Sequence, residues 1–205
     1  MKLYLVRHGE TAWNKLRKVQ GHSDIALNEY GRYLARETAL GLKGINFYEA
    51  YTSPLVRARE TAEIILEGKE VPIYDEPRIM EMGFGVCEGM CCRGENKEPG
   101  SDEFNKFFTD TANYKVPEGG ESIQEVDQRV GEFLEELYTK EELQDKNILI
   151  STHGAALTAM LNCIKGNRNI ADFWGKGVPK NCSVTEVEVT DGKPVILQEG
   201  KVFYE

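Results

Sequence analysis

The sequence contains few of the residues that build metal sites, disulfide frameworks or membrane spans. Its 205 residues include only three histidines and five cysteines, and no apolar run is long enough to cross a bilayer. The odd number of cysteines and the lack of a paired C-x-x-C motif favour reduced thiols over disulfide bonds. Cys87, Cys91 and Cys92 lie close together, but no histidine lies near them in the sequence, which argues against a metal cluster. We therefore expect no metal ion in this protein.

Positive charge is also scarce. Lysines and arginines number 25 against 34 aspartates and glutamates, which gives a formal net charge of -9. This charge argues against a nucleic acid or an anionic membrane as the partner. The apolar stretch after Lys2 is short and meets Arg7 and His8, so we expect no signal peptide or membrane anchor, and a cytoplasmic location. The length and the 40% content of hydrophobic residues predict one domain, residues 1–205.

What is present is an alternation of strand and helix patterns. Apolar runs typical of buried strands occupy residues 2–6, 48–52 and 147–151. Helical patterns occupy residues 28–44, 53–68, 122–138 and 154–166. Two further strand patterns, 183–189 and 194–200, flank Asp191-Gly192 and predict a hairpin. The order predicts an α/β fold, a three-layer α/β/α sandwich whose mostly parallel sheet has an antiparallel edge strand.

Each predicted helix boundary depends on a cap signal. Ser53 precedes Pro54, the order expected of an N-cap and a first helical residue. Ser122 and Glu125 have the spacing of a capping box. The other boundary signals are one N-cap and three terminating glycines: Asn28, Gly44, Gly68 and Gly166.

Two of the three histidines occupy equivalent places. His8 and His153 each follow a predicted buried strand, and each is followed by glycine. Because the carboxyl ends of parallel strands meet at one edge of a sheet, both imidazoles are expected at one crevice. Arg7 lies beside His8, and Arg57 lies in the first turn of the helix after another strand. Both guanidinium groups are therefore expected at the same edge.

This group of side chains predicts a site for a compact anion. Guanidinium groups and the free N–H groups of helix N-termini both match phosphate. A single histidine at a strand end is more often a structural group than a catalyst. Burying two arginines and two histidines without an anionic ligand would cost on the order of several kcal/mol, so packing alone does not explain the set.

Six segments, in order, resemble those of the histidine phosphatase superfamily, in the branch that holds the cofactor-dependent phosphoglycerate mutases. They are VRHGETAWN, GHSDIALNEYG, SPLVRARETA, EMGFGVCEG, PEGGES and STHGAAL. The resemblance runs from residue 3 to about residue 165. It implies a phosphoglycerate mutase-like fold and, for the phosphatases of this branch, phosphoryl transfer that needs no metal ion or other cofactor.

The resemblance also implies a role for each site residue. His8 takes the phosphoryl group as a phosphohistidine, which requires a neutral imidazole. Glu81 protonates the leaving alcohol and then serves as base for water, and only the resemblance selects it among the acids. The expected catalytic residues are Arg7, His8, Arg57, Glu81 and His153. The expected substrate-binding residues are Arg7, Asn14, Gln20, Gly21, Arg57, Glu81, His153 and Gly154.

Some neighbouring residues are open to a structural interpretation. Glu10 and Thr11 either contact the phosphate or cap the following turn. Arg59 is expected to pair with Glu63 one helical turn away. His22 is either a polar loop residue or part of the pocket.

The resemblance leaves the activity open. Glycolytic mutases carry a long insertion after the equivalent of Gly89, with basic residues for the substrate's second anionic group. Here a specificity insertion at about residues 83–120 is short, although it contains Arg93 and Lys97. We therefore expect a hydrolase of a small phosphorylated metabolite. One alternative is a phosphoglycerate mutase. The other is an inactive phosphate-binding regulatory module, and the complete set of site residues disfavours this second alternative.

Two surface features have alternative interpretations. The insertion's aromatic residues either contact the substrate or pack as a small helix on the sheet: Phe104, Phe107, Phe108 and Tyr114. The predicted hairpin is either a solvated edge or the contact of a homodimer.

Overall fold

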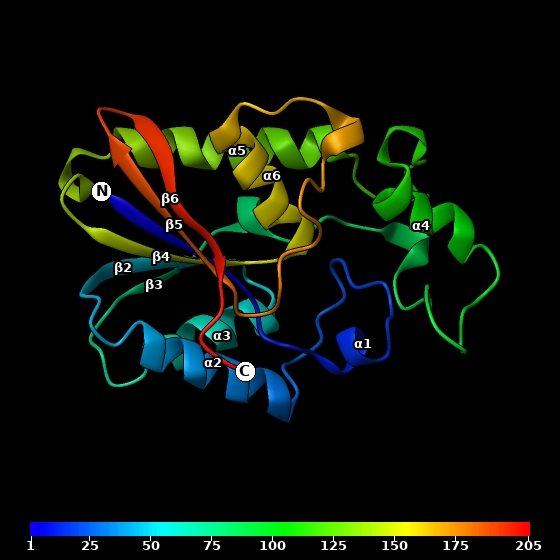
Figure 1. Ribbon diagram of the computed structural model, residues 1–205, viewed down its shortest axis with the longest axis horizontal. Helices are drawn as coiled ribbons and strands as arrows, with labels where there is room; N and C mark the ends of the chain where they lie inside the picture. The colour runs from blue at the N-terminus through cyan, green and yellow to red at the C-terminus, as the bar shows by residue number, and fades with distance from the viewer.

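A six-stranded mixed sheet forms the centre of the computed structural model, which describes all 205 residues (Figure 1). The strands are β1 (Lys2–Arg7), β2 (Phe47–Thr52), β3 (Ile73–Asp75), β4 (Asn147–Thr152), β5 (Val184–Thr190) and β6 (Lys193–Lys201). They lie in the order β3-β2-β4-β1-β5-β6. The first four in this order pair in parallel, and β5 and β6 pair antiparallel. The predicted mostly parallel sheet and its antiparallel hairpin are confirmed.

Helices cover both faces of the sheet. They are α1 (Ala12–Lys15), α2 (Glu29–Gly41), α3 (Val56–Ile65), α4 (Ser101–Thr109), α5 (Ile123–Thr139) and α6 (Gly154–Lys165). In Figure 1, α5 and α6 lie on one side of the sheet and α2 and α3 on the other. The predicted three-layer α/β/α sandwich is therefore confirmed. None of these helices is both long and apolar enough to span a membrane.

The central strands are buried on both faces because their side chains alternate between two apolar clusters. Leu3 and Leu5 of β1 pack in the larger cluster, with α5 and α6. Tyr4 and Val6 of the same strand pack in the second cluster, which includes Ile65 of α3. Burying one leucine completely stabilises a fold by about 1.5–3 kcal/mol. The continuous apolar run of β1 is therefore what places it in the middle of the sheet.

Several cap signals fix helix boundaries as predicted. The Asn28 side chain accepts a hydrogen bond from the Gly31 N–H and starts α2. The Ser122 and Glu125 side chains bond each other's backbone N–H, which forms the capping box of α5. Gly166 caps α6 with a φ of 68°, a conformation that favours glycine.

The predicted end of α2 at Gly44 is wrong. The helix ends at Gly41, and Leu42 follows with a non-helical backbone. Leu42 is buried in the second cluster, so the chain leaves the helix early to place this side chain in the core. A Cβ on Gly41 would meet the Phe203 ring at 2.1 Å, which explains a glycine inside the last turn.

The predicted boundaries of α3 are also wrong. The helix starts at Val56 instead of Pro54, and Leu55 occupies the N-cap position without a side-chain bond. The Ser53 hydroxyl accepts from the Leu55 N–H at 3.3 Å and so forms a local turn ahead of the helix. The helix ends at Ile65, and Gly68 lies in the turn that follows.

The segment 83–120 lies beyond the carboxyl ends of the strands, where Figure 1 shows α4 in green. Phe104 and Phe107 on one face of α4 are buried against Phe84, with ring centroids 5.3 Å apart in both pairs. Trp174 contacts Phe107 from another loop. These aromatic residues thus pack as a small helix at the end of the sheet. The division into one domain with a specificity insertion stays a prediction.

Candidate active site

Five side chains from four segments meet at the carboxyl edge of the sheet: Arg7, His8, Arg57, Glu81 and His153. Arg7 ends β1 and lies opposite Thr152 of β4, so the two strands end at the same level. His8 and His153 follow them directly, with ring centroids 5.1 Å apart. Arg57 lies in the first turn of α3, which follows the neighbouring strand β2. Parallel pairing therefore brings together groups that are far apart in the sequence.

His8 is held as a neutral imidazole. The residue is 2% exposed, and its Nδ1 lies 2.6 Å from the Gly9 carbonyl oxygen. Because a carbonyl only accepts, Nδ1 carries the hydrogen and Nε2 keeps its lone pair. Burial lowers the pKa of His8 well below 6.5, and the charges of Arg57 and Arg7 lower it further. His8 can therefore act as a nucleophile through Nε2.

Arg57 is fully buried and bonded only to neutral acceptors. Its Nη2 donates to the Gly21 carbonyl at 2.6 Å, its Nη1 to the Ser23 carbonyl at 2.8 Å, and its Nε to His153 Nδ1 at 3.2 Å. Burial lowers the pKa of Arg57 to about 10. No carboxylate pairs with it, so its charge is available to an anionic ligand.

Arg7 has an unused donor in the site. Its Nη1 donates to the Pro179 carbonyl, and its buried Nε has no hydrogen-bond partner. A Cβ on Gly154 would lie 3.6 Å from this Nε and 3.5 Å from Glu81 Oε2. Leaving a buried donor unpaired costs about 1–3 kcal/mol, which an incoming anion would recover. Gly154 therefore marks the space between the cation and the carboxylate.

Both ring nitrogens of His153 have partners. Nδ1 accepts from Arg57 Nε, so Nε2 carries the hydrogen and donates to Ser53 Oγ at 2.7 Å. Burial lowers the pKa of His153 most, and the charge of Arg57 and the neighbouring His8 lower it further. His153 thus orients Arg57 in this arrangement. To bind phosphate directly, it would have to exchange one of these two bonds.

Glu81 is positioned by the start of α6. Its carboxylate accepts from the backbone N–H groups of Met82 at 2.9 Å, Ala155 at 3.0 Å and Ala156 at 3.1 Å. Glu81 is only 7% exposed. The free N–H groups of a helix N-terminus bind a carboxylate well, so α6 fixes this group beside the two histidines.

A network that sequence reasoning missed holds the backbone of Glu81. The Glu81 carbonyl accepts from Arg129 Nη2 at 3.0 Å and lies 2.9 Å from His22 Nε2. Glu121 pairs with Arg129 at 3.0 Å and lies 3.4 Å from His22. Burial opposes ionisation of Glu121, but its bonds from His22, Arg129 and the Gly83 N–H outweigh burial and lower its pKa to about 2. Of these side chains, His22 lies in the segment GHSDIALNEYG and Glu121 in the segment PEGGES, but nothing in the sequence links either one to Glu81.

The other predicted binding residues lie around α1. Asn14 Oδ1 accepts from the Thr11 N–H, and Gln20 Oε1 accepts from the Thr11 hydroxyl at 2.7 Å. Both amide NH₂ groups remain as donors. Thr11 is the N-cap of α1, which favours the structural interpretation of this residue. Gly21 supplies a carbonyl to Arg57, and a Cβ there would meet Glu88 Oε1 at 2.3 Å.

The remaining uncertain residues have structural partners. Glu10 accepts from the Asn28 side chain at 2.8 Å. Arg59 pairs with Glu63 at 3.0 Å, as predicted, and with Asp75 at 2.7 Å. No group of three or more His, Cys, Asp or Glu side chains is arranged to hold a metal ion.

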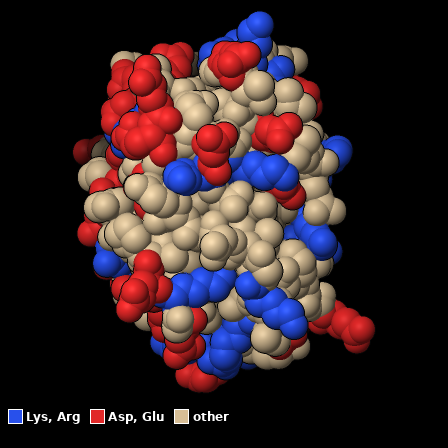
Figure 2. Space-filling view, turned by 90° about the vertical axis from the view of Figure 1, so that its left-hand side faces the viewer, with Lys and Arg blue, Asp and Glu red and all other residues tan.

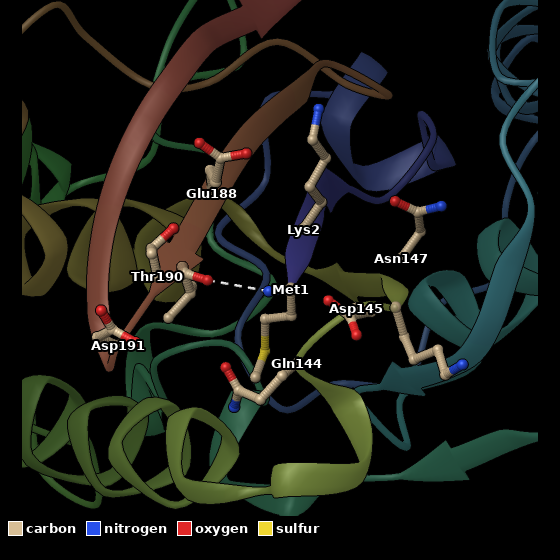
Figure 3. Close-up of a pocket in the computed structure, with 10 residues that line it drawn as sticks. Met1, Lys2, Gln144, Asp145, Asn147, Glu188, Thr190 and Asp191 are labelled. Atoms are coloured by element: carbon tan, nitrogen blue, oxygen red, sulfur yellow. Dashed lines mark hydrogen bonds between the residues drawn. The ribbon is translucent and has the colours of Figure 1, made fainter.

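A cavity of about 490 Å³ lies at the opposite edge of the sheet. Figure 3 shows it around Met1, whose amino group donates to the Val189 carbonyl at 2.9 Å. Its walls contain Lys2, Asp145 and Glu188 but no histidine or arginine. Acidic and basic side chains are mixed over this face (Figure 2). The charged groups suited to phosphate lie at the other edge.

The chain belongs to the histidine phosphatase superfamily, branch 1, whose family model matches residues 3–201. A relative from Serratia proteamaculans, named "Probable phosphoglycerate mutase GpmB", is 33% identical over 189 residues, which cover 92% of this chain and 85% of that protein. The resemblance to this superfamily and to its phosphoglycerate mutase-like members is therefore confirmed.

Two solved structures are similar over nearly the whole chain. YhfR from Bacillus stearothermophilus is 33% identical, with a TM-score of 0.88, and the match covers 98% of this chain and 97% of that one. A phosphoserine phosphatase from Entamoeba histolytica, in complex with 3-phosphoglyceric acid, is 30% identical, with a TM-score of 0.80 and the same coverage. The relatives thus include proteins named as phosphatases and as mutases.

Proposed function

We propose that this protein is a metal-independent phosphomonoester hydrolase that acts on a small phosphorylated metabolite through a phosphohistidine at His8. One observation carries the proposal: a neutral His8, with its Nδ1 hydrogen bonded to Gly9, lies at one edge with two arginines that have no carboxylate partner. This arrangement supplies a nucleophile and a receptor for the charge on a phosphoryl group.

The first half-reaction transfers the phosphoryl group to the protein. His8 Nε2 attacks phosphorus, the N–P bond forms, and the bond from phosphorus to the alcohol oxygen breaks. Glu81 donates a proton to that oxygen, so the alcohol leaves neutral. Arg7 and Arg57 stabilise the charge that is spread over the phosphoryl oxygens in the transition state.

The second half-reaction restores the enzyme. Water attacks phosphorus and gives a proton to Glu81, the N–P bond breaks, and inorganic phosphate leaves. His8 returns to its neutral form and Glu81 to its protonated form, so protons and charges balance over the cycle.

Hydrolysis is favoured over isomerisation by the short segment after Gly89. Its one α-helix, α4, has nine residues, and its aromatic side chains pack on one another. A mutase must keep water away from the phosphohistidine while the substrate reorients, which a long covering element achieves. The relative named as a probable phosphoglycerate mutase is the reason to test mutase activity as the alternative.

The deciding experiment follows two products from the same preparation in the presence of EDTA. We expect release of inorganic phosphate from an aryl phosphate at the rate seen without EDTA. With 2- or 3-phosphoglycerate, we expect phosphate release to exceed interconversion. Loss of turnover on chelation would contradict the metal-independent mechanism, and faster interconversion would establish the mutase.

A further inference from the structure

A cavity of about 250 Å³ lies beside the catalytic groups, between α1 and the segment that carries α4. Asn14, an expected phosphate ligand, and Val178 both line it. Val178 Cγ1 and Glu81 Oε2 each lie 3.5 Å from the position of a Cβ on Gly154. Val178 therefore lies near both the cavity and the carboxylate that would protonate the leaving alcohol, and none of the five catalytic side chains lines the cavity itself. In Figure 1, α1 and α4 lie at the same end of the molecule.

One wall of this cavity is aromatic. Phe84, Phe104 and Phe108 line it, with 5.3 Å between the first two ring centroids and 6.1 Å between the last two. Phe108 also stacks on Trp174 at 5.3 Å, and the Trp174 indole N–H donates to the Phe107 carbonyl. This second layer supports the wall, whose rings meet edge to face and present an apolar surface of defined shape.

The lining of the cavity is also cationic. Arg17, Lys18 and Arg93 line it, none of them pairs with a carboxylate, and no Asp or Glu contributes to the lining. Arg93 lies over the Phe108 ring at 4.6 Å, and Lys18 lies over Trp13 at 5.7 Å. In a chain of net charge -9, three unpaired cations around one cavity point to an anionic ligand.

The backbone conformation of Arg17 is set by the end of α1. Its φ of 57° lies in the left-handed region, and the Arg17 N–H donates to the Asn14 carbonyl at 3.1 Å while the Lys18 N–H donates to the Trp13 carbonyl at 2.9 Å, which closes the helix. The Arg17 carbonyl accepts from the Cys92 N–H at 3.1 Å, so the conformation is locked by pairing with the opposite wall.

We propose that the cavity holds the leaving alcohol of the substrate, and that this alcohol combines a compact aromatic or other flat apolar body with a second anionic group. The proposal depends on the phosphatase function argued above. The volume is below the roughly 300–1,000 Å³ of pockets for drug-sized ligands, so the apolar body is about one ring in size. The rings contact that body, and the cations bind the second anion.

The test compares two aryl phosphates of similar size whose para substituents differ in charge: 4-carboxyphenyl phosphate and 4-(hydroxymethyl)phenyl phosphate. We expect kcat/KM to be about tenfold higher for the carboxylate, the order expected of a charge-assisted hydrogen bond. Phosphoserine, which is anionic but has no ring, should have a lower kcat/KM than the carboxyphenyl ester. A ratio of one or less between the two aryl esters would overturn the proposal.

Variants assign this preference to the cations. Arg93→Gln and Arg17→Gln should each lower the carboxylate-to-neutral ratio several-fold, and the double variant should bring it close to one. Lys43→Gln removes the same charge from the turn after α2, far from the cavity, and should leave the ratio unchanged. Because each ratio is taken within one variant, a general loss of stability or chemistry cancels. A double variant with the original ratio would overturn the proposal.

Binding to a chemically inactive variant separates this inference from the proposed function. Calorimetry with His8→Asn should show tighter binding of the carboxyphenyl ester than of the neutral ester. If the carboxyphenyl ester binds more tightly than the neutral ester but the wild type hydrolyses neither of them, the proposed function fails and the cavity assignment stands. If the wild type hydrolyses both equally and the variant binds both equally, the cavity assignment fails and the phosphatase function stands.

Discussion

At the scale of single residues, the three histidines have different proton environments. His8 and His153 are buried among arginines, which keeps their pKa values well below 6.5. His22 lies at Glu121, whose hydrogen bond raises the pKa of His22. The first two are therefore neutral at physiological pH, and the third is more readily charged.

This difference predicts how stability depends on pH. An unfolded chain protonates His8 and His153 below about pH 6.5 while the folded protein does not, so acid favours unfolding. The slope of the unfolding free energy against pH should fall by up to about 1.4 kcal/mol per pH unit in His8→Asn. Denaturant titrations between about pH 6.5 and 4.5 measure it.

His22→Asn is the matched control for that slope. The raised pKa of His22 means that its folded and unfolded forms are both protonated below about pH 6.5. Its stabilising contribution is complete there and is lost only as the pH rises through the folded pKa. The acid slope should therefore be unchanged in His22→Asn, and an unchanged slope in His8→Asn would disprove the neutral nucleophile.

The role of Glu81 predicts a dependence on the leaving group. Glu81→Gln keeps the shape of the side chain but removes the proton donor. With an alkyl phosphate, whose alcohol leaves poorly, kcat/KM should fall by about 10²- to 10⁴-fold. With 4-nitrophenyl phosphate, whose phenol leaves without help, the fall in the rate of phosphohistidine formation should be much smaller. Equal losses for both substrates in this step would contradict a general acid at this position.

At the scale of elements, the ends of the strands predict much of the site from the sequence alone. Features that depend on side-chain contacts between distant residues could not be predicted. His8 and His153 could be placed together because each follows a buried strand of a parallel sheet. The start of α3 at Val56 could not be predicted, since the Ser53 hydroxyl does not cap the helix but bonds to the Leu55 N–H and to a histidine 100 residues away. Glu81 could be selected only through the family resemblance. Its position is set by the N-terminus of α6 and by α5.

The contact between α5 and Glu81 predicts a separation of stability from catalysis. Arg129 donates to the carbonyls of Arg78, Met80 and Glu81. Arg129→Met should lower the free energy of unfolding by about 1–3 kcal/mol, because buried carbonyls lose their donor. It should also lower kcat more than it changes KM, since the acid is misplaced.

Ser122→Ala on the same helix controls for that result. It removes the capping-box hydroxyl and should cost about 1 kcal/mol of stability. Because the Ser122 side chain bonds only within the cap, kcat should hold. If both variants reduced kcat in proportion to stability, α5 would have no positioning role.

At the scale of the whole molecule, a net charge of -9 surrounds a local group of buried cations. The unpartnered Nε of Arg7 and the unpaired charge of Arg57 should make inorganic phosphate a stabilising ligand. At 100 times its Kd, phosphate should raise the free energy of unfolding by about 2.7 kcal/mol. For a chain of this size, Tm should rise by about 5–10 °C.

Scanning calorimetry in phosphate and in sodium chloride of equal ionic strength measures this rise. The chloride arm should show none of it, and Arg57→Met should abolish it. A rise of equal size in both salts would show general screening of the molecule's charge instead of a binding site.

The central claim is that the phosphoryl group passes through His8, and rapid quenching with a labelled aryl phosphate tests it most directly. We predict a burst of label bound to the protein, stable to alkali and labile to acid, that maps to His8 and is absent in His8→Asn. Turnover without bound label on this timescale, or full turnover by His8→Asn, would contradict the claim.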